Sequence, residues 1–210
     1  MLVIFIGIDG SGKTTYALKL YQELKVRGIK CKYIHFDSLF AYKLLNTINN
    51  IANLTKKERV APKDLSAKRS SFVSIVKGTI LFLILVIDDI FFYLLRLKGE
   101  EKEIVICDRY FYDSAISCIY SGARESFIYK IYRKIFPLPD MIFLLDIDPS
   151  IAYSRKQEDS VNYLACKREI YLNLYLIIQC RKIKIDSSNL FNKSFAVVRD
   201  KVLELLGDNK

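Results

Sequence analysis

Five short runs of apolar residues recur along the chain, and each is nearly continuous rather than alternating with polar residues. They are Leu2–Ile8, Lys32–His35, Glu103–Cys107, Met141–Ile147 and Ile183–Asp186. Continuous apolar runs of this length are typical of strands buried on both faces of a parallel sheet. The pattern therefore predicts five buried parallel strands.

Between these runs, apolar residues return at helical spacing. The predicted helices cover Thr14–Arg27, Leu39–Leu54, Leu65–Leu97, Ser126–Phe136, a segment opened by Asp148 and Pro149, Val161–Cys180 and Phe191–Leu206. We expect Gly28 to end the first helix, Gly78 to be a break in the third, and Asp148 to cap the helix that begins at Pro149. Strands that alternate with helices indicate an α/β fold. No new strand pattern follows the charged loop Thr55–Asp64, so we expect a single domain over residues 1–210.

The composition indicates a folded chain with phosphate-bearing partners. Hydrophobic residues make up 51% and charged residues 27%, which excludes a disordered or collagen-like chain. Lys and Arg number 33 against 23 Asp and Glu, a formal charge of +10. This surplus favours a nucleotide, a nucleic acid or an anionic surface, although charges that only solvate the surface are the alternative. Basic residues are spread along the chain without a recognised module, so we expect no nucleic acid partner.

Cysteine usage and hydropathy indicate a cytoplasmic protein with no membrane partner. The five cysteines form no C-x-x-C pair and the chain has one His, which excludes a Cys/His zinc site and predicts a reducing compartment. The apolar N-terminus lacks a basic region, so we expect a buried strand there rather than a signal peptide. The apolar run Thr79–Leu95 carries Asp88 and Asp89 near its middle, and a buried or dimer-forming helix is expected instead of a membrane span.

The strongest motif is G-I-D-G-S-G-K-T at Gly7–Thr14, which matches G-x-x-x-x-G-K-[ST] between a predicted strand and a predicted helix. Glycines there let successive backbone N–H groups face a phosphate, and the helix N-terminus adds positive potential. Lys13 is expected to reach the β- and γ-phosphates of ATP, and the Thr14 hydroxyl to ligate Mg²⁺. A glycine turn without a ligand is the alternative. The predicted ATP-binding residues here are Gly7, Gly10, Ser11, Gly12, Lys13, Thr14 and Thr15.

A second motif, I-V-I-C-D-R-Y, covers Ile104–Tyr110. An apolar strand that ends in an acidic residue is typical of the second metal-binding element of P-loop proteins, so Asp108 is predicted to hold Mg²⁺ directly or through water. Arg109 follows at the carboxyl edge of the sheet, where ligands bind in open α/β folds. Its guanidinium can clamp a phosphate through two parallel N–H bonds, and a surface salt bridge is the alternative.

These motifs, with F-L-L-D-I-D-P-S-I-A-Y-S-R-K-Q-E-D at Phe143–Asp159 and I-D-S-S at Ile185–Ser188, resemble the thymidylate kinases, a family of P-loop nucleoside monophosphate kinases. The resemblance runs from Val3 to about Asn189. It implies a P-loop kinase fold with a five-stranded parallel sheet in the order 2-3-1-4-5 and helices on both faces. It also implies a homodimer that transfers a phosphoryl group from ATP, with Mg²⁺, to dTMP.

The same resemblance implies roles for individual residues. Asp9 would contact the acceptor sugar hydroxyl, Arg109 would hold the acceptor phosphate, and Ser114 would line the acceptor pocket. Arg155 and Lys156 fall on a lid at about residues 149–160, from which Arg155 supplies charge to the transition state. Ser188 lies in the loop Ser187–Asn189 that borders the adenine. The predicted catalytic residues are therefore Lys13, Asp108, Arg109 and Arg155.

Three stretches depart from the family pattern on the acceptor side. The family has an Arg-containing turn where this chain reads His35-Phe36-Asp37-Ser38; His35 is the expected stand-in, and a purely structural His is the alternative. About Ser117 and Cys118 replace a Tyr-Gln pair after D-R-Y. Val86–Asp89 replaces a stretch that presents an Arg to thymine.

Carboxylates at Asp88 and Asp89 would suit an amino group on the base, as in cytosine or guanine. The alternative is that both point to solvent or cap a helix, with Arg69 or Arg96 reading the base. Two further functions therefore stay open beside dTMP phosphorylation: a kinase of another or several nucleoside monophosphates, and a P-loop protein that binds nucleotide with little turnover.

Overall fold

The computed structural model describes residues 1–36, 72–97, 103–121 and 123–208, with the backbone alone for residues 72–78 and 97. Its contacts divide the chain into two compact units. The sheet unit comprises Met1–His35, Gly99–Tyr110 and Pro139–Lys210, and the helical unit comprises Phe36–Lys98 and Phe111–Leu138. The single domain over residues 1–210 stays a prediction, and the expected helix Leu39–Leu54 and loop Thr55–Asp64 lie outside the described residues.

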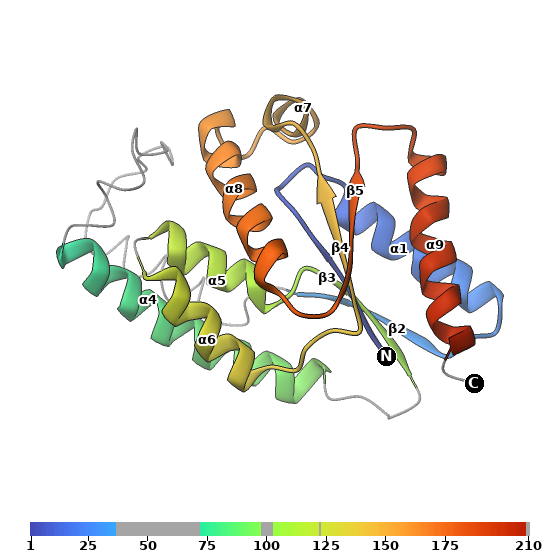
Figure 1. The fold of residues 1–210 in the computed structure, drawn as a ribbon, viewed down its shortest axis with the longest axis horizontal. Helices are drawn as coiled ribbons and strands as arrows, with labels where there is room; N and C mark the ends of the chain where they lie inside the picture. The colour runs from blue at the N-terminus through green and yellow to red at the C-terminus, as the bar shows by residue number, and fades with distance from the viewer. Residues whose placement is uncertain (37–71, 98–102, 122, 209–210) are drawn as a thin grey trace. The chain divides into compact units, whose positions relative to one another are not determined.

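The sheet unit is built on five parallel strands in the order β2-β3-β1-β4-β5 (Figure 1). The strands are β1 (Leu2–Ile6), β2 (Cys31–His35), β3 (Ile104–Asp108), β4 (Met141–Asp146) and β5 (Arg181–Asp186). All five were predicted within two residues of their observed bounds, and the predicted strand order is confirmed.

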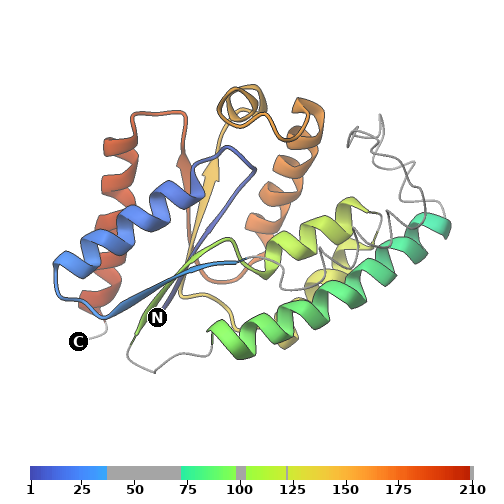
Figure 2. The ribbon, with the colours of Figure 1, turned by 180° about the vertical axis from the view of Figure 1, so that it is seen from behind.

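Helices cover both faces of this sheet. They are α1 (Lys13–Val26), α7 (Pro149–Arg155), α8 (Val161–Ile177) and α9 (Phe191–Asp208). Val3 and Phe5 pack in one core cluster with α1 and α9, whereas Ile4 and Ile6 point to the opposite face and are also fully buried. Helix α8 contacts β4, and the view from behind in Figure 2 brings α1 to the front of the sheet. Burial on both faces explains why the strands lack polar alternation.

Local capping residues set the ends of these helices. Gly28 adopts a left-handed backbone (φ 72°) just after α1, and the Asp148 carboxylate accepts a hydrogen bond from the Ser150 N–H (2.8 Å) at the start of α7. Both caps were predicted. Ser160 caps α8 by accepting a hydrogen bond from the Tyr163 N–H (3.3 Å). These caps satisfy backbone groups that a helix end leaves unpaired.

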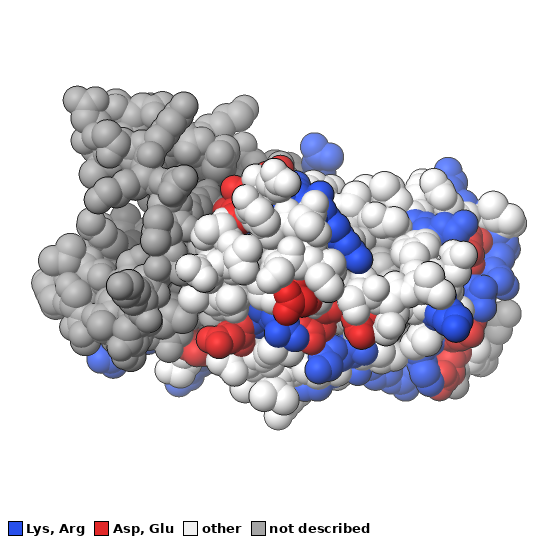
Figure 3. All heavy atoms as spheres, turned by 90° about the horizontal axis from the view of Figure 1, so that it is seen from above, with Lys and Arg blue, Asp and Glu red and all other residues white. Residues whose placement is uncertain are grey.

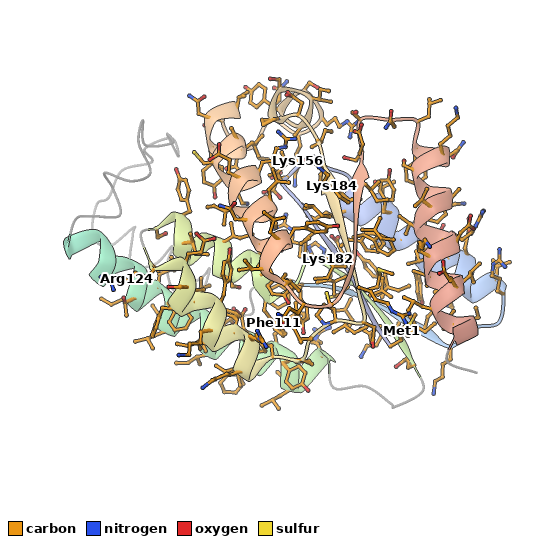
Figure 4. The ribbon with its side chains drawn as sticks, in the orientation of Figure 1. Met1, Phe111, Arg124, Lys156, Lys182 and Lys184 are labelled. Carbon is orange, nitrogen blue, oxygen red and sulfur yellow. The ribbon has the colours of Figure 1, made fainter. Side chains whose placement is uncertain are left out.

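Strand β5 forms an edge of the sheet and carries basic residues. Lys182 and Lys184 lie along it (Figure 4). The Lys182 ammonium donates to the carbonyl oxygens of Leu176 (3.1 Å) and Ile178 (2.9 Å). It thereby satisfies unpaired carbonyls at the end of α8, and charged residues along an edge strand oppose pairing with another sheet.

The helical unit contains α4 (Phe72–Phe92), a π-helical turn at Tyr93–Leu97, α5 (Phe111–Tyr120) and α6 (Glu125–Ile135). Helix α5 contacts both α4 and α6, and the rings of Phe111 and Phe136 stack with their centroids 3.8 Å apart. The predicted helix Leu65–Leu97 is described from Phe72 onward, and Gly78 lies inside it without a break. Helix α5 was not predicted. Within the described ranges, no helix is long and apolar enough to span a membrane.

Candidate active site

The phosphate-binding loop between β1 and α1 requires glycine. Gly10 and Gly12 have φ angles of 86° and 92°, a left-handed conformation that L side chains rarely adopt. A Cβ atom on Gly10 would also lie 2.4 Å from the backbone oxygen of Ala152 in α7. The loop is closed by a hydrogen bond from the Ser11 N–H to the Ile8 oxygen (3.2 Å). The glycine-rich motif at Gly7–Thr14 therefore forms the compact loop that its sequence predicts.

Lys13 is buried at the start of α1 with its ammonium turned toward the loop. Its Nζ donates to the carbonyl oxygens of Gly7 (2.7 Å) and Ile8 (2.8 Å), and it lies 3.9 Å from Oδ1 of Asp9. The positive charge is thus held where the motif predicts the ATP phosphates.

Asp108 is fully buried at the carboxyl end of β3. Its Oδ2 accepts hydrogen bonds from the hydroxyls of Thr14 (2.6 Å) and Tyr33 (3.3 Å) and lies 2.8 Å from Nδ1 of His35. Burial alone would raise the pKa of the Asp108 carboxyl, but the hydrogen bonds from His35 and Thr14 hold it below its usual value. The Asp108 carboxylate is therefore kept ionised. Burial, together with the charge of this carboxylate, raises the pKa of Tyr33 to about 12.

Thr14 and Asp108 fit the predicted Mg²⁺. The second carboxylate oxygen of Asp108, Oδ1, is buried and has no hydrogen-bond partner among the described residues. Mg²⁺ prefers oxygen ligands and is commonly held by one or two carboxylates together with substrate phosphates and water. In the part of the chain that the structure describes, no cluster of three or more His, Cys, Asp or Glu residues forms a metal cage. One carboxylate beside a hydroxyl suits a metal that is shared with phosphates.

Arg109 has an unusual backbone conformation. Its φ angle is 70°, and it is the one non-glycine residue with a positive φ among those described. Its guanidinium donates to Oδ1 of Asp9. Backbone strain of this kind persists where surrounding contacts impose it, and it is frequent at functional sites.

A cavity of about 480 Å³ opens in the sheet unit beside these residues. Arg155, at the end of α7, lines it and donates to the Ser187 carbonyl oxygen (3.1 Å). Lys156 follows (Figure 4) and pairs with Glu158 (3.0 Å). The cavity is lined by Asp9, Gly10, Ser11, Gly12, Lys13, Thr14, Thr15, Tyr16, Arg109, Arg155, Lys156, Ser187, Asn189 and Phe191. The structure thus brings the phosphate-binding loop, Arg109 and the predicted lid residues around one space.

Five predicted site residues are absent from the lining of this cavity: Gly7, His35, Asp108, Ser114 and Ser188. The Ser188 N–H and hydroxyl both donate to the Asp186 carboxylate, whereas the neighbouring Ser187 and Asn189 line the cavity. His35 contacts Asp108. Ser114 belongs to the helical unit, so its acceptor-binding role stays a prediction.

Lys167 is a site residue that the sequence analysis missed. It lies on α8, only 8% exposed, with its Nζ 3.0 Å from Oδ2 of Asp9. The signal that could have found it is helical spacing, because Leu164, Tyr171 and Leu174 are buried on the same helix three, four and seven residues away. A lysine on the buried stripe of a helix needs a partner.

The Asp9 carboxylate lies near three positively charged side chains, of which Lys167 is one. Burial alone would raise the pKa of its carboxyl, but the positive charges of Lys167, Lys13 and Arg109 outweigh burial and hold the pKa well below the ordinary range. Asp9 is therefore a fully ionised carboxylate in the wall of the cavity.

The structure corrects the alternative reading of Asp88 and Asp89. Neither points to solvent, since their exposed fractions are 1% and 2%. Both oxygens of Asp89 are occupied inside the helical unit, Oδ1 by the Ser114 hydroxyl (2.9 Å) and Oδ2 by the Tyr132 hydroxyl (2.7 Å). Arg69 lies outside the described residues.

The surface charges of one face are mixed. In Figure 3 the Lys and Arg side chains of the described residues lie among Asp and Glu side chains and form no area of one sign. On this face, the excess of Lys and Arg over Asp and Glu therefore forms no positively charged patch.

Comparisons with known proteins agree with these motifs. The family model described as thymidylate kinase matches residues 5–198. A probable thymidylate kinase of Staphylothermus marinus is 29% identical, over 97% of this chain and 95% of the relative. One from Sulfurisphaera tokodaii is 30% identical, over 82% and 80%, and one from Methanosphaera stadtmanae is 27% identical, over 98% and 99%.

Proposed function

Because the chain belongs to the thymidylate kinase family, we propose that it transfers the γ-phosphoryl group of ATP to the 5′-phosphate of dTMP, which gives ADP and dTDP. The observation that carries this proposal is the cavity in which the phosphate-binding loop, Arg109 and Arg155 meet. Phosphoryl transfer needs positioning and charge neutralisation more than covalent catalysis, and this cavity supplies both.

The donor side would use the loop and its helix. The backbone N–H groups of the loop and the Lys13 ammonium bind the ATP phosphates, with Ser11 and Thr15 beside them. Thr14 and Asp108 would hold Mg²⁺, which neutralises phosphate charge when bound. The orphaned oxygen of Asp108 supports this assignment. Ser187 and Asn189 line the same cavity and would border the adenine.

The acceptor side would use Asp9 and Arg109. Asp9 accepts a hydrogen bond from the sugar hydroxyl, and Arg109 clamps the acceptor phosphate against the γ-phosphate of ATP. Arg155 adds positive charge as the lid at about residues 149–160 closes, which also excludes water from the phosphates. His35 contributes through Asp108, which it contacts directly.

A second candidate is a kinase of another nucleoside monophosphate. The observation that favours it is the α4 segment, where the family presents an Arg to thymine and this chain has Val86-Ile87-Asp88-Asp89. A site without that donor discriminates less between bases.

We also propose that the protein is a cytoplasmic homodimer. Helix α4 exposes Ile80, Leu83, Ile87 and Phe91 at spacings of three or four residues, which places them on one side of the helix. A second copy covering this side would remove large apolar side chains from water. Light scattering after size-exclusion chromatography tests it. A monomeric wild-type protein would refute the proposal.

The experiment that tests the activity is a coupled assay of ADP release with ATP, Mg²⁺ and each of dTMP, dUMP, dCMP and dGMP. We expect kcat/KM to be highest for dTMP. Lys13→Ala should lower kcat/KM on the order of 10²- to 10⁴-fold, because it removes the main charge contact to the β- and γ-phosphates. A folded Lys13→Ala variant with normal activity would refute the donor site. Faster turnover of dCMP or dGMP would establish the second candidate, and ATP binding without turnover would establish a binding protein.

A further inference from the structure

Asp9 faces three cations, and its two oxygens divide them. Oδ1 accepts from the Arg109 guanidinium and lies 3.9 Å from the Lys13 ammonium. Oδ2 lies 3.0 Å from the ammonium of Lys167. The carboxylate side chain is only 11% exposed, so little water reaches it. Three positive charges surround one buried negative charge, although a single positive charge would neutralise the carboxylate.

The cations on Oδ1 are the ones that the proposed reaction would recruit. Lys13 is the lysine of the phosphate-binding motif, and Arg109 is the proposed clamp of the acceptor phosphate. Phosphates carry more charge than a carboxylate and bind such groups through several oxygens, so they compete with Asp9 for both.

Lys167 stands apart from this competition by its position. It comes from the buried stripe of α8, its side chain is 10% exposed, and its ammonium also lies over the Tyr163 ring at 5.4 Å. It is absent from the residues that line the cavity. Its charge is therefore directed at Oδ2 of Asp9 rather than at the space for the phosphates.

We propose that Lys167 is a positioning residue that holds Asp9 ionised and in place after the two substrate phosphates have drawn Lys13 and Arg109 away. The inference rests on the proposed function for the identity of the two ligands. A buried carboxylate left without a positively charged partner is destabilised even where the sugar hydroxyl donates to it, so the acceptor complex would bind weakly without Lys167. With ATP alone, Arg109 still pairs with Asp9, and Lys167 is needed less.

The test is a binding cycle by calorimetry, with a non-hydrolysable ATP analogue and Mg²⁺ first and dTMP second. Lys167→Met should weaken the ATP analogue less than threefold and weaken dTMP in the resulting complex about tenfold. Lys167→Arg, which keeps the charge, should restore most of the dTMP affinity. Lys201→Met, which removes an exposed positive charge paired with Glu204 on α9, is the matched control and should change neither affinity.

Asp9→Asn distinguishes positioning from a direct effect on the phosphate. In the Asp9→Asn background, Lys167→Met should cost no further dTMP affinity, because the carboxylate that it serves has been neutralised. An equal loss in both backgrounds, equal losses for the ATP analogue and dTMP, or no loss at all would overturn the proposal. If Lys167→Met fails to fold, as judged by circular dichroism, Lys167→Gln takes its place in the same cycle.

The two proposals fail separately. Wild-type protein that phosphorylates dTMP but shows additive losses in the cycle refutes the role of Lys167 alone. Wild-type protein that binds another monophosphate instead of dTMP refutes the proposed substrate, and the cycle is then run with that monophosphate. Wild-type protein that binds none of the four monophosphates overturns both, since no acceptor phosphate would then recruit Arg109.

Discussion

Asp89 is a buried carboxyl group whose protonation should control the pH dependence of stability. It lies on α4 within the helical unit and accepts hydrogen bonds from Ser114 and Tyr132. Burial raises the pKa of this carboxyl to about 8; the two hydroxyls oppose that rise, and the negative charges of Asp88 and Asp113 add to it. The group is therefore mostly neutral in the folded protein at neutral pH, whereas it is ionised in the unfolded chain.

The size of the effect follows from the two pKa values. The folded state binds the proton more tightly than the unfolded state, whose pKa is 3.8, so the contribution to stability is fully present below that value and is lost as pH rises through about 8. Each pH unit between the two values costs about 1.4 kcal/mol. From pH 6 to pH 9 the free energy of unfolding should fall by about 3 kcal/mol because of this group alone.

Asp89→Asn isolates the contribution, because asparagine keeps the shape and cannot ionise. We expect the free energy of unfolding of the wild type, relative to the variant, to fall by about 3 kcal/mol across that pH range. Urea unfolding followed by circular dichroism at four pH values measures it. Asp200→Asn, at an exposed carboxylate paired with Arg199, is the control and should keep the wild-type pH dependence. Parallel curves for the wild type and Asp89→Asn would refute the reasoning.

Two further predictions concern the active site. Arg109→Ala should lower kcat on the order of 10²-fold or more with dTMP, while ATP affinity changes less than threefold, because Arg109 is proposed to serve the acceptor phosphate; an equal loss of ATP affinity in calorimetry would assign it to the donor instead. Gly10→Ala should destabilise the protein in urea unfolding by more than Gly28→Ala, which costs about 1–2 kcal/mol for its left-handed backbone alone. The Cβ at Gly10 meets the Ala152 oxygen at 2.4 Å, whereas the one at Gly28 meets no atom within 4 Å, so equal losses would contradict the close contact.

The strands were predictable because their burial leaves a direct mark on the sequence. Both faces of β1, β3 and β4 are covered, so apolar residues follow one another without interruption. Helix α5 was missed because most of its residues, from Phe111 to Ile119, are buried, which leaves a polar stripe only one residue wide. Asp113 and Ser117 form this stripe at a spacing of four, and two polar positions are too few to indicate a helical period.

Part of the site could be predicted because it is local in sequence. The phosphate-binding loop, Lys13 and Thr14 belong to one motif, and Asp108 with Arg109 belongs to another. Lys167 could not be assigned in this way, since its partner Asp9 lies 158 positions away and only the packing of α8 brings them together. The assignment of Ser188 to the ATP site stays a prediction, and the turn after β5 directs its hydroxyl to Asp186.

The left-handed backbone of Arg109 explains how two consecutive residues contact one loop and its helix. In an extended strand, successive side chains point to opposite faces, so Asp108 and a regular Arg109 would diverge. With φ at 70°, Asp108 bonds Thr14 while Arg109 bonds Asp9. This conformation costs about 1–2 kcal/mol for a residue with a side chain, and the ion pair with a buried carboxylate offsets that cost. If an acceptor phosphate replaces Asp9 as the partner of Arg109, as proposed above, the new ion pair would offset the same cost.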